Sequence, residues 1–508
     1  MLDFGVLRRA WAGDESAGDG DAPEWPQAGI AIEGDFSGIQ RFVLRPVPGA
    51  GGAARRLRAR SFRVLALTRL VARSVEKAFE DAGAKLFYSA GGRFLVVARR
   101  RPDWAPRLGV LQRSLDEELL REYRGELVFH LAGAEYSDGR IPGKALSESL
   151  NRRKRMPLGE ALRTAEGWAT ERFFFRPPSG ARCDGCAGTE EVRLAGGEQL
   201  CATCLSDREL GGRLLGHESV GLVAEAEGPL GLLGERWAVA GQRGLEISWI
   251  GHAPKHNGQL ATFEELAGKG LGRPYLGYLR IDGDRIGEAF ARLENQPLRI
   301  RGLSLLLDRF FSARVEKLLA GRFTNIYPVY GGGDDLFVIG PWQDTLGFAS
   351  ALQEEFRAIT DGGLTLSAGM ALAKKKQHIL AKADEAEDAL TAQAKAKRDS
   401  IHALGATMGW GDFRRALEAG RKLGELRARG KLRSAMLQNI LELHQRWRQR
   451  DGRWHSLLYY QVERNLRESP EAGQWVKSAF LKPGEVWPQA DFAVRYAMLA
   501  GSGEEKGE

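Results

Sequence analysis

One arrangement of strands and helices occurs twice in this chain, and that repeat limits the possible fold more than any other feature. The segment IAIEGDFSGIQRF at 30–42 matches YLRIDGDRIGEAF at 278–290, with Gly34 on Gly283 and Asp35 on Asp284. In each copy a long helical pattern follows, and then two β-prone runs around a glycine turn. A repeat of this size means that one structural unit is built twice.

Each copy continues with a further helix and a further strand. These are WAPRLGVLQRSLDEELLREY and ELVFHLAGAEY in the first copy, and TLGFASALQEEFRAIT and GLTLSAGMALA in the second. The resulting order, β-α-β-β-α-β, is the ferredoxin-like arrangement of palm domains, an antiparallel sheet with helices on one face. The sequence therefore predicts an α+β protein with two palm domains.

The turn between the two β-prone runs of the second copy, in NIYPVYGGGDDLFVIG, carries adjacent aspartates, Asp334 and Asp335. Asp is common in ordinary turns, which leaves a polar turn as the alternative. However, three glycines already meet any dihedral requirement of this turn. The first strand of the copy ends in Asp282, Gly283 and Asp284 and lies beside this hairpin in the predicted topology. Alternation places Asp282 and Asp284 on the same face of their strand.

Three or four carboxylates at one sheet edge repel each other unless cations neutralise them. Two Mg²⁺ or Mn²⁺ ions on Asp282, Asp334 and Asp335, about 3.5 to 4 Å apart, would form the clamp of phosphoryl or nucleotidyl transfer. Gly332 and Gly333 would let the backbone approach a triphosphate closely. The sequence thus predicts a two-metal site at this edge.

The first copy has GGRF at 91–94 where the second has GGDD at 332–335, which places Arg93 on Asp334 and Phe94 on Asp335. This copy has lost the hairpin acids. We expect it to be able to bind a nucleotide but not to hold the metal ions.

All four cysteines lie in CDGCAGTEEVRLAGGEQLCATC, as two Cys-x-x-Cys pairs: Cys183, Cys186, Cys201 and Cys204. The 14 residues at 187–200 suit a short β-hairpin between two zinc knuckles. A redox Cys-x-x-Cys would not need a matching second pair, and disulfides are rare in cytosolic proteins. Because four sulfur ligands leave no open coordination position, we expect the Zn²⁺ to be structural.

The charge balance favours polyanionic partners, although a mildly basic surface is the alternative. Lysine and arginine number 74 against 66 acidic residues, which gives a net charge of +8 and a pI near 9.3. The basic residues cluster in RRLRAR at 55–60, NRRKR at 151–155, KKK at 374–376, and at Arg427, Arg429, Lys431 and Arg433.

The sequence has no uninterrupted apolar span of about 20 residues. Its N-terminus, MLDFGVLRRAWAGDESAGDGD, lacks the charged start and apolar middle of a signal peptide. We therefore expect a cytoplasmic protein with no membrane partner.

Together these motifs resemble the large palm-domain signature subunit of type III CRISPR-Cas effector complexes. The shared features are GDFSGIQ before an Arg-rich helix with ARSF, a degenerate first hairpin, a four-cysteine module between the palms, RIDGDRIG, YGGGDD, and LSAG at 366–369. The resemblance covers residues 29–410 closely and the helical tail loosely. It implies two palms of the nucleotidyl cyclase type.

What the resemblance implies is synthesis of cyclic oligoadenylates from ATP, for antiviral defence, when target RNA is bound. The 3′-hydroxyl of one ATP would attack the α-phosphate of another and release pyrophosphate. The metal-holding residues would be Asp282, Asp334 and Asp335, and nucleotide contacts would come from Gly332, Gly333, Asp284, Ser37, Gly91, Gly92, Ser367 and Lys395. Implied partners are crRNA, target RNA, and the small and backbone subunits of a multisubunit complex.

Two departures from the family limit this transfer. Many members carry an N-terminal nuclease domain with a His-Asp motif, but none of the eight histidines here precedes an aspartate. We therefore do not predict cleavage of single-stranded DNA. After LSAG the family usually has a glycine and an asparagine, whereas AKAKRDSI has Asp399 and no glycine, so Lys395 as a triphosphate contact competes with an exposed helix lysine.

The expected organisation has five parts: a lead-in at 1–28, a first palm at 29–165, a zinc-binding domain at 166–250, a second palm at 251–410 and a helical domain at 411–508. In the helical domain, one apolar face is expected to be core, formed by Met436, Leu437, Ile440, Leu441, Leu443 and Trp447. The resemblance suggests that this bundle docks against the small subunits.

Three other functions compete with this interpretation. A non-catalytic scaffold of a crRNA ribonucleoprotein is possible, but the intact GGDD argues against it. A diguanylate cyclase would normally pair single palms and lacks a zinc module. A templated polymerase would need fingers and thumb domains, for which the chain has no space.

Overall fold

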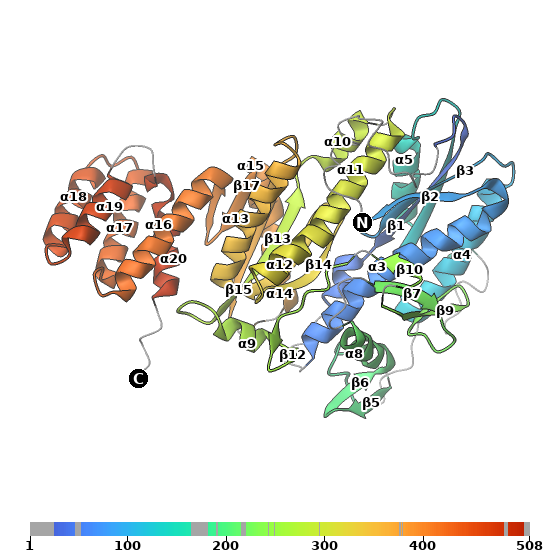
Figure 1. Ribbon diagram of the computed structural model, residues 1–508, viewed down its shortest axis with the longest axis horizontal. Helices are drawn as coiled ribbons and strands as arrows, with labels where there is room; N and C mark the ends of the chain where they lie inside the picture. The colour runs from blue at the N-terminus through green and yellow to red at the C-terminus, as the bar shows by residue number, and fades with distance from the viewer. Residues whose placement is uncertain are drawn as a thin grey trace.

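The structure is a computed structural model of the 508-residue chain. It describes residues 25–45, 52–163, 181–188, 191–214, 220–241, 243–247, 249–293, 295–374, 377, 379–481 and 486–501. Most of the lead-in predicted at 1–28 and the start of the zinc-binding range at 166–180 lie outside the described residues. Figure 1 shows the C-terminal helices at one end, the second palm in the middle and the first palm at the other end, with the zinc hairpin below the first palm.

Each palm contains the four-stranded antiparallel sheet that the sequence predicts. The first has the order β2-β3-β1-β4, built from β1 (Gly29–Ser37), β2 (Lys85–Ala90), β3 (Arg93–Ala98) and β4 (Val128–Tyr136). The second has the corresponding order β14-β15-β13-β16, built from β13 (Tyr275–Gly283), β14 (Tyr327–Gly332), β15 (Asp335–Pro341) and β16 (Leu366–Lys374). Both have the ferredoxin-like strand order, which confirms the predicted repeat.

The second sheet is longer than predicted. Strand β17 (Ser400–Ala403) runs parallel to β16, and β18 (Ala406–Gly409) pairs with β17. The hairpin closes through Leu404 with a φ of 50° and Gly405 with a φ of 77°. The sequence analysis missed this hairpin because each strand has only four residues.

Helices cover both faces of each palm sheet, so the expectation of helices on one face is wrong. On one face of the first sheet lie α3 (Ala53–Ala78) and α4 (Trp104–Tyr123), in one core with Ile30 and Ile32. On the other face α5 (Gly143–Lys154) packs on Ala31. A strand covered on both faces reads as a continuous apolar run, as IAI does here.

The second palm repeats this arrangement. One face carries α11 (Pro297–Arg309), η4 (Phe310–Arg314), α12 (Val315–Gly321) and α13 (Trp342–Ile359). The other carries α14 (Ile379–Asp388), whose Ala383 and Ala386 pack in one core with Tyr278 of β13. That helix continues through η5 (Ala389–Ala394) into α15 (Lys395–Lys397).

The region between the palms contains two modules. The cysteine module has β5 (Val192–Ala195), β6 (Glu198–Cys201) and α8 (Ala202–Arg213). A small antiparallel sheet of order β10-β7-β9-β8 follows, from β7 (Val220–Ala224), β8 (Leu230–Leu232), β9 (Glu235–Val239) and β10 (Leu245–Ile247). Both modules contact α3 (Figure 1).

The Arg-rich start of α3 is buried, contrary to its interpretation as part of a basic surface. Arg56, Arg58 and Arg60 are 2%, 2% and 3% exposed. The Arg58 guanidinium donates to the carbonyls of His252 and Leu214, at 2.9 and 3.1 Å. These arginines bind the modules that cover α3 and therefore do not contribute to a surface for polyanions.

The C-terminal region is a helical bundle, as predicted, with α16 (Trp410–Ala428), α17 (Ser434–Arg448), α18 (Trp454–Asn465), α19 (Pro470–Phe480) and α20 (Ala490–Ala500). The predicted apolar face is confirmed as core, since Met436, Leu437, Ile440 and Leu443 are buried and Leu441 and Trp447 pack against them.

Short elements complete the described chain: α2 (Ile39–Val43), η2 (Glu80–Ala82), α6 (Gly159–Leu162), β11 (Lys255–His256), β12 (Gln259–Leu260), α9 (Phe263–Gly268), α10 (Ile286–Arg292) and η6 (Trp487–Gln489). Among the described residues, no helix combines the length and the apolar character needed to cross a membrane.

Candidate active site

The sheet register of the second palm brings its carboxylates together. Asp282 on β13 lies directly opposite Asp335 on β15, and Ser367 on β16 lies on its other side. The hairpin turns between Gly332 and Asp335, where Gly333 has a φ of 64° that favours glycine. Backbone pairing alone therefore places the three predicted metal ligands at one edge of the sheet.

Burial and mutual repulsion favour protonation of these carboxylates. Burial and, after it, the charge of Asp282 raise the pKa of Asp335 to about 7. Burial also raises the pKa of Asp282 to about 6, although Lys395 opposes this shift. The pKa of Asp334 is raised by burial as well. Such a cluster fits a bound cation, because a cation would remove the repulsion.

Lys395, at the start of α15, forms an ion pair with Asp282. Its side chain is 32% exposed and that of Asp282 is 26% exposed, so the pair stands at the rim of the site. The sequence analysis weighed an exposed helix lysine against a triphosphate contact. The structure places Lys395 against the carboxylate cluster.

A buried arginine lies beneath the carboxylates, and the sequence analysis did not identify it. Arg280 is 1% exposed and forms an ion pair with Glu387 at 2.9 Å. It also donates to the Tyr330 hydroxyl at 2.6 Å, and that hydroxyl hydrogen-bonds to Asp335. Since Asp282 and Arg280 are two residues apart on a strand, alternation could have indicated that they share a face.

Asp284 does not face the site, so the expected alternation with Asp282 is wrong at this point. Strand β13 ends at Gly283, and the Asp284 carboxylate turns into the protein, where it is 6% exposed. It accepts hydrogen bonds from Thr365 Oγ1 and Ser367 Oγ, both at 2.7 Å, and from the Asp399 N–H at 2.9 Å. Asp284 and Ser367 thus bind each other.

The Asp284 carboxylate also holds the turn that follows Lys395. Arg398 has φ 61° and ψ 163°, a region that is essentially restricted to glycine. Asp399 follows with a φ of 44°. The strained backbone of this turn is tied to Asp284 through the Asp399 N–H.

The two palms meet at their hairpins around a cavity of about 320 Å³. The second palm contributes Tyr330 and the turn through Asp335, and the first palm contributes α3, the start of α2, Asp35, Gly91 and Arg93. A Cβ on Gly91 would stand 3.1 Å from the Gly332 oxygen and from the Gly333 Cα. The hairpin tips therefore lie close together, and the φ of 57° at Gly91 favours glycine there.

The register of the first palm corrects the predicted alignment of the repeat. Asp35 lies opposite Arg93, as Asp282 lies opposite Asp335. Asp35 therefore stands at the place of Asp282 rather than Asp284, and Arg93 stands at the place of Asp335 rather than Asp334. The alignment failed because the glycines were matched by letter, whereas strand pairing sets the true correspondence.

The correspondence extends to the residues around these positions. Glu33 stands at the place of Arg280 and forms an ion pair with Arg93. Lys154, the last residue of α5, forms an ion pair with Asp35, as Lys395 does with Asp282. The lysine–aspartate pair is thus repeated in both palms. At the other two positions the charges are exchanged: the first palm has Glu33 and Arg93 where the second has Arg280 and Asp335.

Of the other predicted residues of the first palm, Ser37 is not among those that line the inter-palm cavity. The Ser37 hydroxyl is 3.1 Å from His130 Nε2. Burial and the charge of Lys154 lower the pKa of His130 to about 4. Gly92 lines a neighbouring cavity of about 440 Å³ on the other side of the same hairpin. Gly332 and Gly333 line the inter-palm cavity with Gly91.

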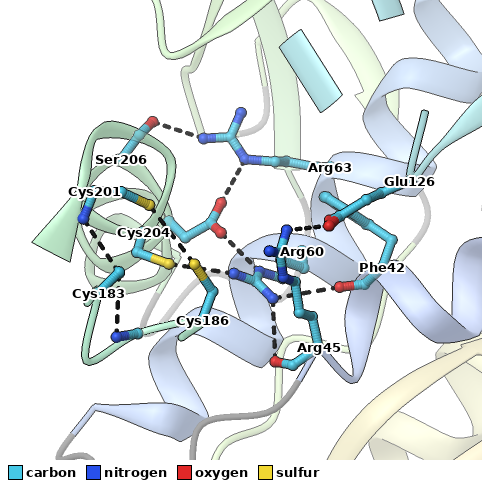
Figure 2. Close-up of polar contacts among 12 residues, drawn as sticks. Phe42, Arg45, Arg60, Arg63, Glu126, Cys183, Cys186, Cys201, Cys204 and Ser206 are labelled. Atoms are coloured by element: carbon cyan, nitrogen blue, oxygen red, sulfur yellow. Dashed lines mark hydrogen bonds and ion pairs between the residues drawn. The ribbon is translucent and has the colours of Figure 1, made fainter. Parts of the chain in front are cut away.

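The four cysteines form a separate cluster. All four are buried free thiols, and one ligand atom from each lies within 4.8 Å of the others. Among the described residues this is the only group of three or more His, Cys, Asp or Glu side chains that close together. The N–H groups of Gly185 and Cys201 donate to Cys183 Sγ at 3.3 and 3.2 Å (Figure 2). Such donors stabilise a metal-bound thiolate.

The cysteine module is attached to the first palm by buried charges. Asp207 on α8 is 0% exposed and accepts from Arg60 Nε and Arg63 Nε, both at 2.8 Å. Arg60 Nη2 also lies 3.4 Å from Cys204 Sγ, and Arg63 Nη2 donates to Ser206 at 2.6 Å (Figure 2). The sequence analysis missed these residues, since Arg60 belonged to a run that suggested a surface and no motif marked Arg63 or Asp207.

Two protein-family models match this chain, one in each palm. The model described as Csm1 subunit domain B matches residues 30–160. The model described as Cas10/Cmr2, second palm domain, matches residues 275–402. The chain belongs to the Cas10/Csm1 family.

Among its relatives is the CRISPR system single-strand-specific deoxyribonuclease Cas10/Csm1 (subtype III-A) of Thermococcus onnurineus (strain NA1). The two are 28% identical over 435 residues, which cover 74% of this chain and 55% of the relative. The protein of the same description from Streptococcus thermophilus is 25% identical over 407 residues, covering 72% and 52%. This Cas10/Csm1 chain thus spans about half the length of the curated relatives it matches.

Solved structures of Csm1 share the fold. A Csm1–Csm4 cassette in complex with cA4 has a TM-score of 0.69 at 20% identity, over 94% of this chain and 70% of that chain. A cassette in complex with one ATP has a TM-score of 0.69 at 20% identity, over 97% and 72%. At these identities the likeness establishes the fold alone.

Proposed function

We propose that this Cas10/Csm1 chain converts ATP to cyclic oligoadenylates by two-metal nucleotidyl transfer at the inter-palm cavity. The observation that carries the proposal is the pairing of Asp282 with Asp335, which lines a cavity shared by both palms. Related Csm1–Csm4 cassettes have been crystallised with cA4, cA3 and ATP, which supports adenine nucleotides as the substrate class.

Both palms line the cavity, which supports a pair of nucleotides that react with each other, one held on each palm. The second palm would hold the donor, whose α-phosphate is attacked, and the first palm would hold the acceptor near Gly91, Gly92 and Ser37. A bond forms between the acceptor 3′-oxygen and the α-phosphorus, and the bond to the departing pyrophosphate breaks. The close approach of the two hairpin tips would help to fix the positions of the two reactants relative to each other.

Asp282, Asp334 and Asp335 are the residues that would hold two Mg²⁺ or Mn²⁺ ions, with Gly332 and Gly333 beside the triphosphate. Such ions activate the attacking hydroxyl and stabilise the leaving oxygen. Arg280 and Tyr330 hold Asp335 from beneath, so its carboxylate is oriented before any ligand binds. Lys395 neutralises Asp282 and can turn toward a triphosphate, while Asp284 and Ser367 fix the turn behind it.

For the cysteine cluster we propose structural Zn²⁺. Cys186 Sγ and Cys201 Sγ are 3.8 Å apart, which fits two ligands of a tetrahedral site with Zn–S bonds of about 2.3 Å. Because the module is clamped to α3 through Asp207, bound zinc would support the wall of the first palm.

The proposed partners are crRNA, target RNA, and the small and backbone subunits of a type III-A complex. A related Csm1–Csm4 subcomplex is described as part of the type III-A CRISPR-Csm interference complex, which supports this assembly. We do not extend the deoxyribonuclease activity in the relatives' names to these 508 residues, which contain no His-Asp dipeptide.

The decisive test uses the purified complex with crRNA and matching target RNA. It is incubated with labelled ATP and Mg²⁺ or Mn²⁺, and the wild type is compared with Asp334→Ala/Asp335→Ala. We expect oligoadenylate and pyrophosphate from the wild type only. No product with any metal or nucleotide would favour the alternative, a non-catalytic scaffold subunit of a crRNA ribonucleoprotein.

A further inference from the structure

The first palm carries a positive charge where the second carries a catalytic carboxylate. Arg93 stands opposite Asp35 as Asp335 stands opposite Asp282. Beneath it, Glu33 stands where the second palm has Arg280. One position is thus anionic in one palm and cationic in the other, and the partner that supports it has the opposite charge in each case.

The Arg93 guanidinium is held in place but is accessible. Its Nε and Nη2 both bind the Glu33 carboxylate, which is 4% exposed, while the Arg93 side chain is 46% exposed. Among the residues that the structure describes, Nη1 has no hydrogen-bond partner. A guanidinium fixed along one edge can still donate from the other, and that geometry suits a phosphate.

Arg93 lies in the wall of the inter-palm cavity, together with three carboxylates, Asp35, Asp334 and Asp335. Among the described residues that line this cavity, it is the only one with a positive charge. Its field reaches the second palm, since it lowers the pKa of Asp334 against the effect of burial. A phosphate that enters without a metal ion therefore finds electrostatic attraction at Arg93 and repulsion elsewhere.

The balance of charges supports this difference between the palms. In the first palm, Glu33 and Asp35 are matched by Arg93 and Lys154. Among the described residues of the second palm, Asp282, Asp334, Asp335 and Glu387 are matched by two cations, Arg280 and Lys395. The second site has two more carboxylates than cations and needs metal ions to accept a phosphate, whereas the first does not.

We propose that Arg93 forms a metal-independent phosphate site that anchors the nucleotide on the first palm. This rests on the proposed function, and it gives the reaction its direction. The nucleotide bound at Arg93 keeps its own triphosphate intact, because that phosphate is not on the metal-holding palm. It can therefore act only as the acceptor.

The test measures ATP binding to the full chain by calorimetry in a buffer without Mg²⁺ or Mn²⁺ and without a chelator, so that the proposed structural Zn²⁺ is retained. Wild type is compared with Arg93→Gln, with Arg93→Lys, and with Arg292→Gln, a matched control whose side chain is 79% exposed on α10. We expect Arg93→Gln to weaken binding about tenfold, as for loss of one charge-assisted contact, and Arg93→Lys to retain part of it. Arg292→Gln should bind like the wild type.

Two further variants separate binding from folding. Arg93→Gln leaves Glu33 buried without its partner, so the double variant Arg93→Gln/Glu33→Gln, which removes both charges, provides a neutral background. It should bind ATP as weakly as Arg93→Gln. Glu33→Gln alone frees the guanidinium and should bind at least as tightly as the wild type. If the pair were only structural, Glu33→Gln and Arg93→Gln would behave alike, and the proposal would be wrong.

The outcome is independent of whether the chain makes oligoadenylates. Unchanged ATP binding by Arg93→Gln without Mg²⁺ or Mn²⁺ would overturn the Arg93 site, and so would a wild type that binds no ATP under these conditions. Failure of the wild type to consume ATP with Mn²⁺ and target RNA would instead overturn the proposed function, with the binding result unaffected.

Discussion

The two palms of this chain have the same strand order and the same pairing register, yet their reactive edges differ in charge. Both carry a lysine–aspartate pair at the rim, Lys154 with Asp35 and Lys395 with Asp282. They differ at the hairpin. The first palm has Arg93, supported by Glu33, where the second palm has Asp335, supported by Arg280. The difference is an inversion of a supported charge rather than a simple loss of acids.

This comparison teaches that the degenerate palm is still built as a binding site. A hairpin that had only lost its function would not need a buried carboxylate to hold its arginine. Burying Glu33 is costly unless it is paired, and burial raises its pKa against the effect of Arg93. The first palm therefore retains a specific arrangement of charges, one that differs from that of the second.

The largest expected difference between the palms is in activity. Asp282→Asn should lower the rate of ATP conversion by about hundredfold or more, because it removes a carboxylate that would hold the metal ions. Asp35→Asn, the same change at the corresponding position, should lower the rate by no more than about tenfold. Initial rates with Mn²⁺ and target RNA test this, and equal losses would contradict the asymmetry.

Stability should differ at the supporting residues. Arg280→Met leaves Asp335 and Glu387 without their buried partner and should destabilise the protein by about 3–5 kcal/mol. Glu33→Gln should cost far less, about 1 kcal/mol or below, because Arg93 is half exposed and solvent can replace its partner. Denaturation by guanidinium, followed by tryptophan fluorescence, measures both variants. A larger loss for Glu33→Gln would reverse the comparison.

The cysteine module should support one palm only. Asp207→Asn leaves the buried guanidinium groups of Arg60 and Arg63 without a counter-charge, at a cost of about 3 kcal/mol. Hydrogen exchange should then show lost protection in α3 and β1 but not in α13 and β13. Removal of zinc by a chelator should give the same pattern. Equal loss in both palms would show that they unfold together.

The carboxylates of the second palm should make metal binding depend on pH. Ions bind the deprotonated form, so Mn²⁺ affinity should rise about tenfold per pH unit for each proton released and level off above pH 7. Calorimetry between pH 5.5 and 8 tests this. Asp35→Asn should leave the profile unchanged, and an affinity independent of pH would contradict the proposed ligands.

The raised pKa of Asp335 also determines how the stability of the metal-free protein changes with pH. Burial raises the pKa of Asp335 from 3.8 to about 7, so the folded protein holds a proton there that the unfolded chain has already lost. The stabilising contribution of this group is therefore present at low pH and is lost as pH rises through 7. Asp335→Asn should flatten this part of the stability profile.

The smallest expected effect concerns the turns after the two lysines. Arg398→Gly should stabilise the protein by about 1 kcal/mol, since its backbone lies in a region essentially restricted to glycine. Arg155, which follows Lys154 in the first palm, has an ordinary φ of −76°. Arg155→Gly should therefore destabilise by about 0.5–1 kcal/mol. Thermal melts of both variants test the opposite signs.

The sequence predicted the order of the elements and the cysteine cluster, because both depend on short-range patterns. Helical periodicity, alternating strands and Cys-x-x-Cys spacing each involve residues within one element or one turn. The three carboxylates could also be predicted to converge, because β13 lies beside the hairpin in this topology. The strand register could not be predicted from the sequence, because it depends on pairing between strands that are distant in the chain.

Side-chain pairs between residues distant in the chain could not be predicted from the sequence for the same reason. Lys154 is far from Asp35 in the chain, and no local pattern indicates that they meet. The arginines of α3 appeared to form a basic surface, whereas Asp207 and the carbonyls of the inserted modules bury them. The turn at Asp284 shows a further limit, because alternation predicts side-chain direction only while the strand continues.

The contact between the hairpin tips has a mechanical consequence. Where Gly91 meets Gly332 and Gly333, main chain touches main chain, with no side chain between them to change rotamer. The distance between the two reactive edges is therefore set by backbone geometry rather than by side chains that can repack. A single added methyl group at residue 91 would stand 3.1 Å from this main chain, so the two tips would have to move apart by a few tenths of an ångström.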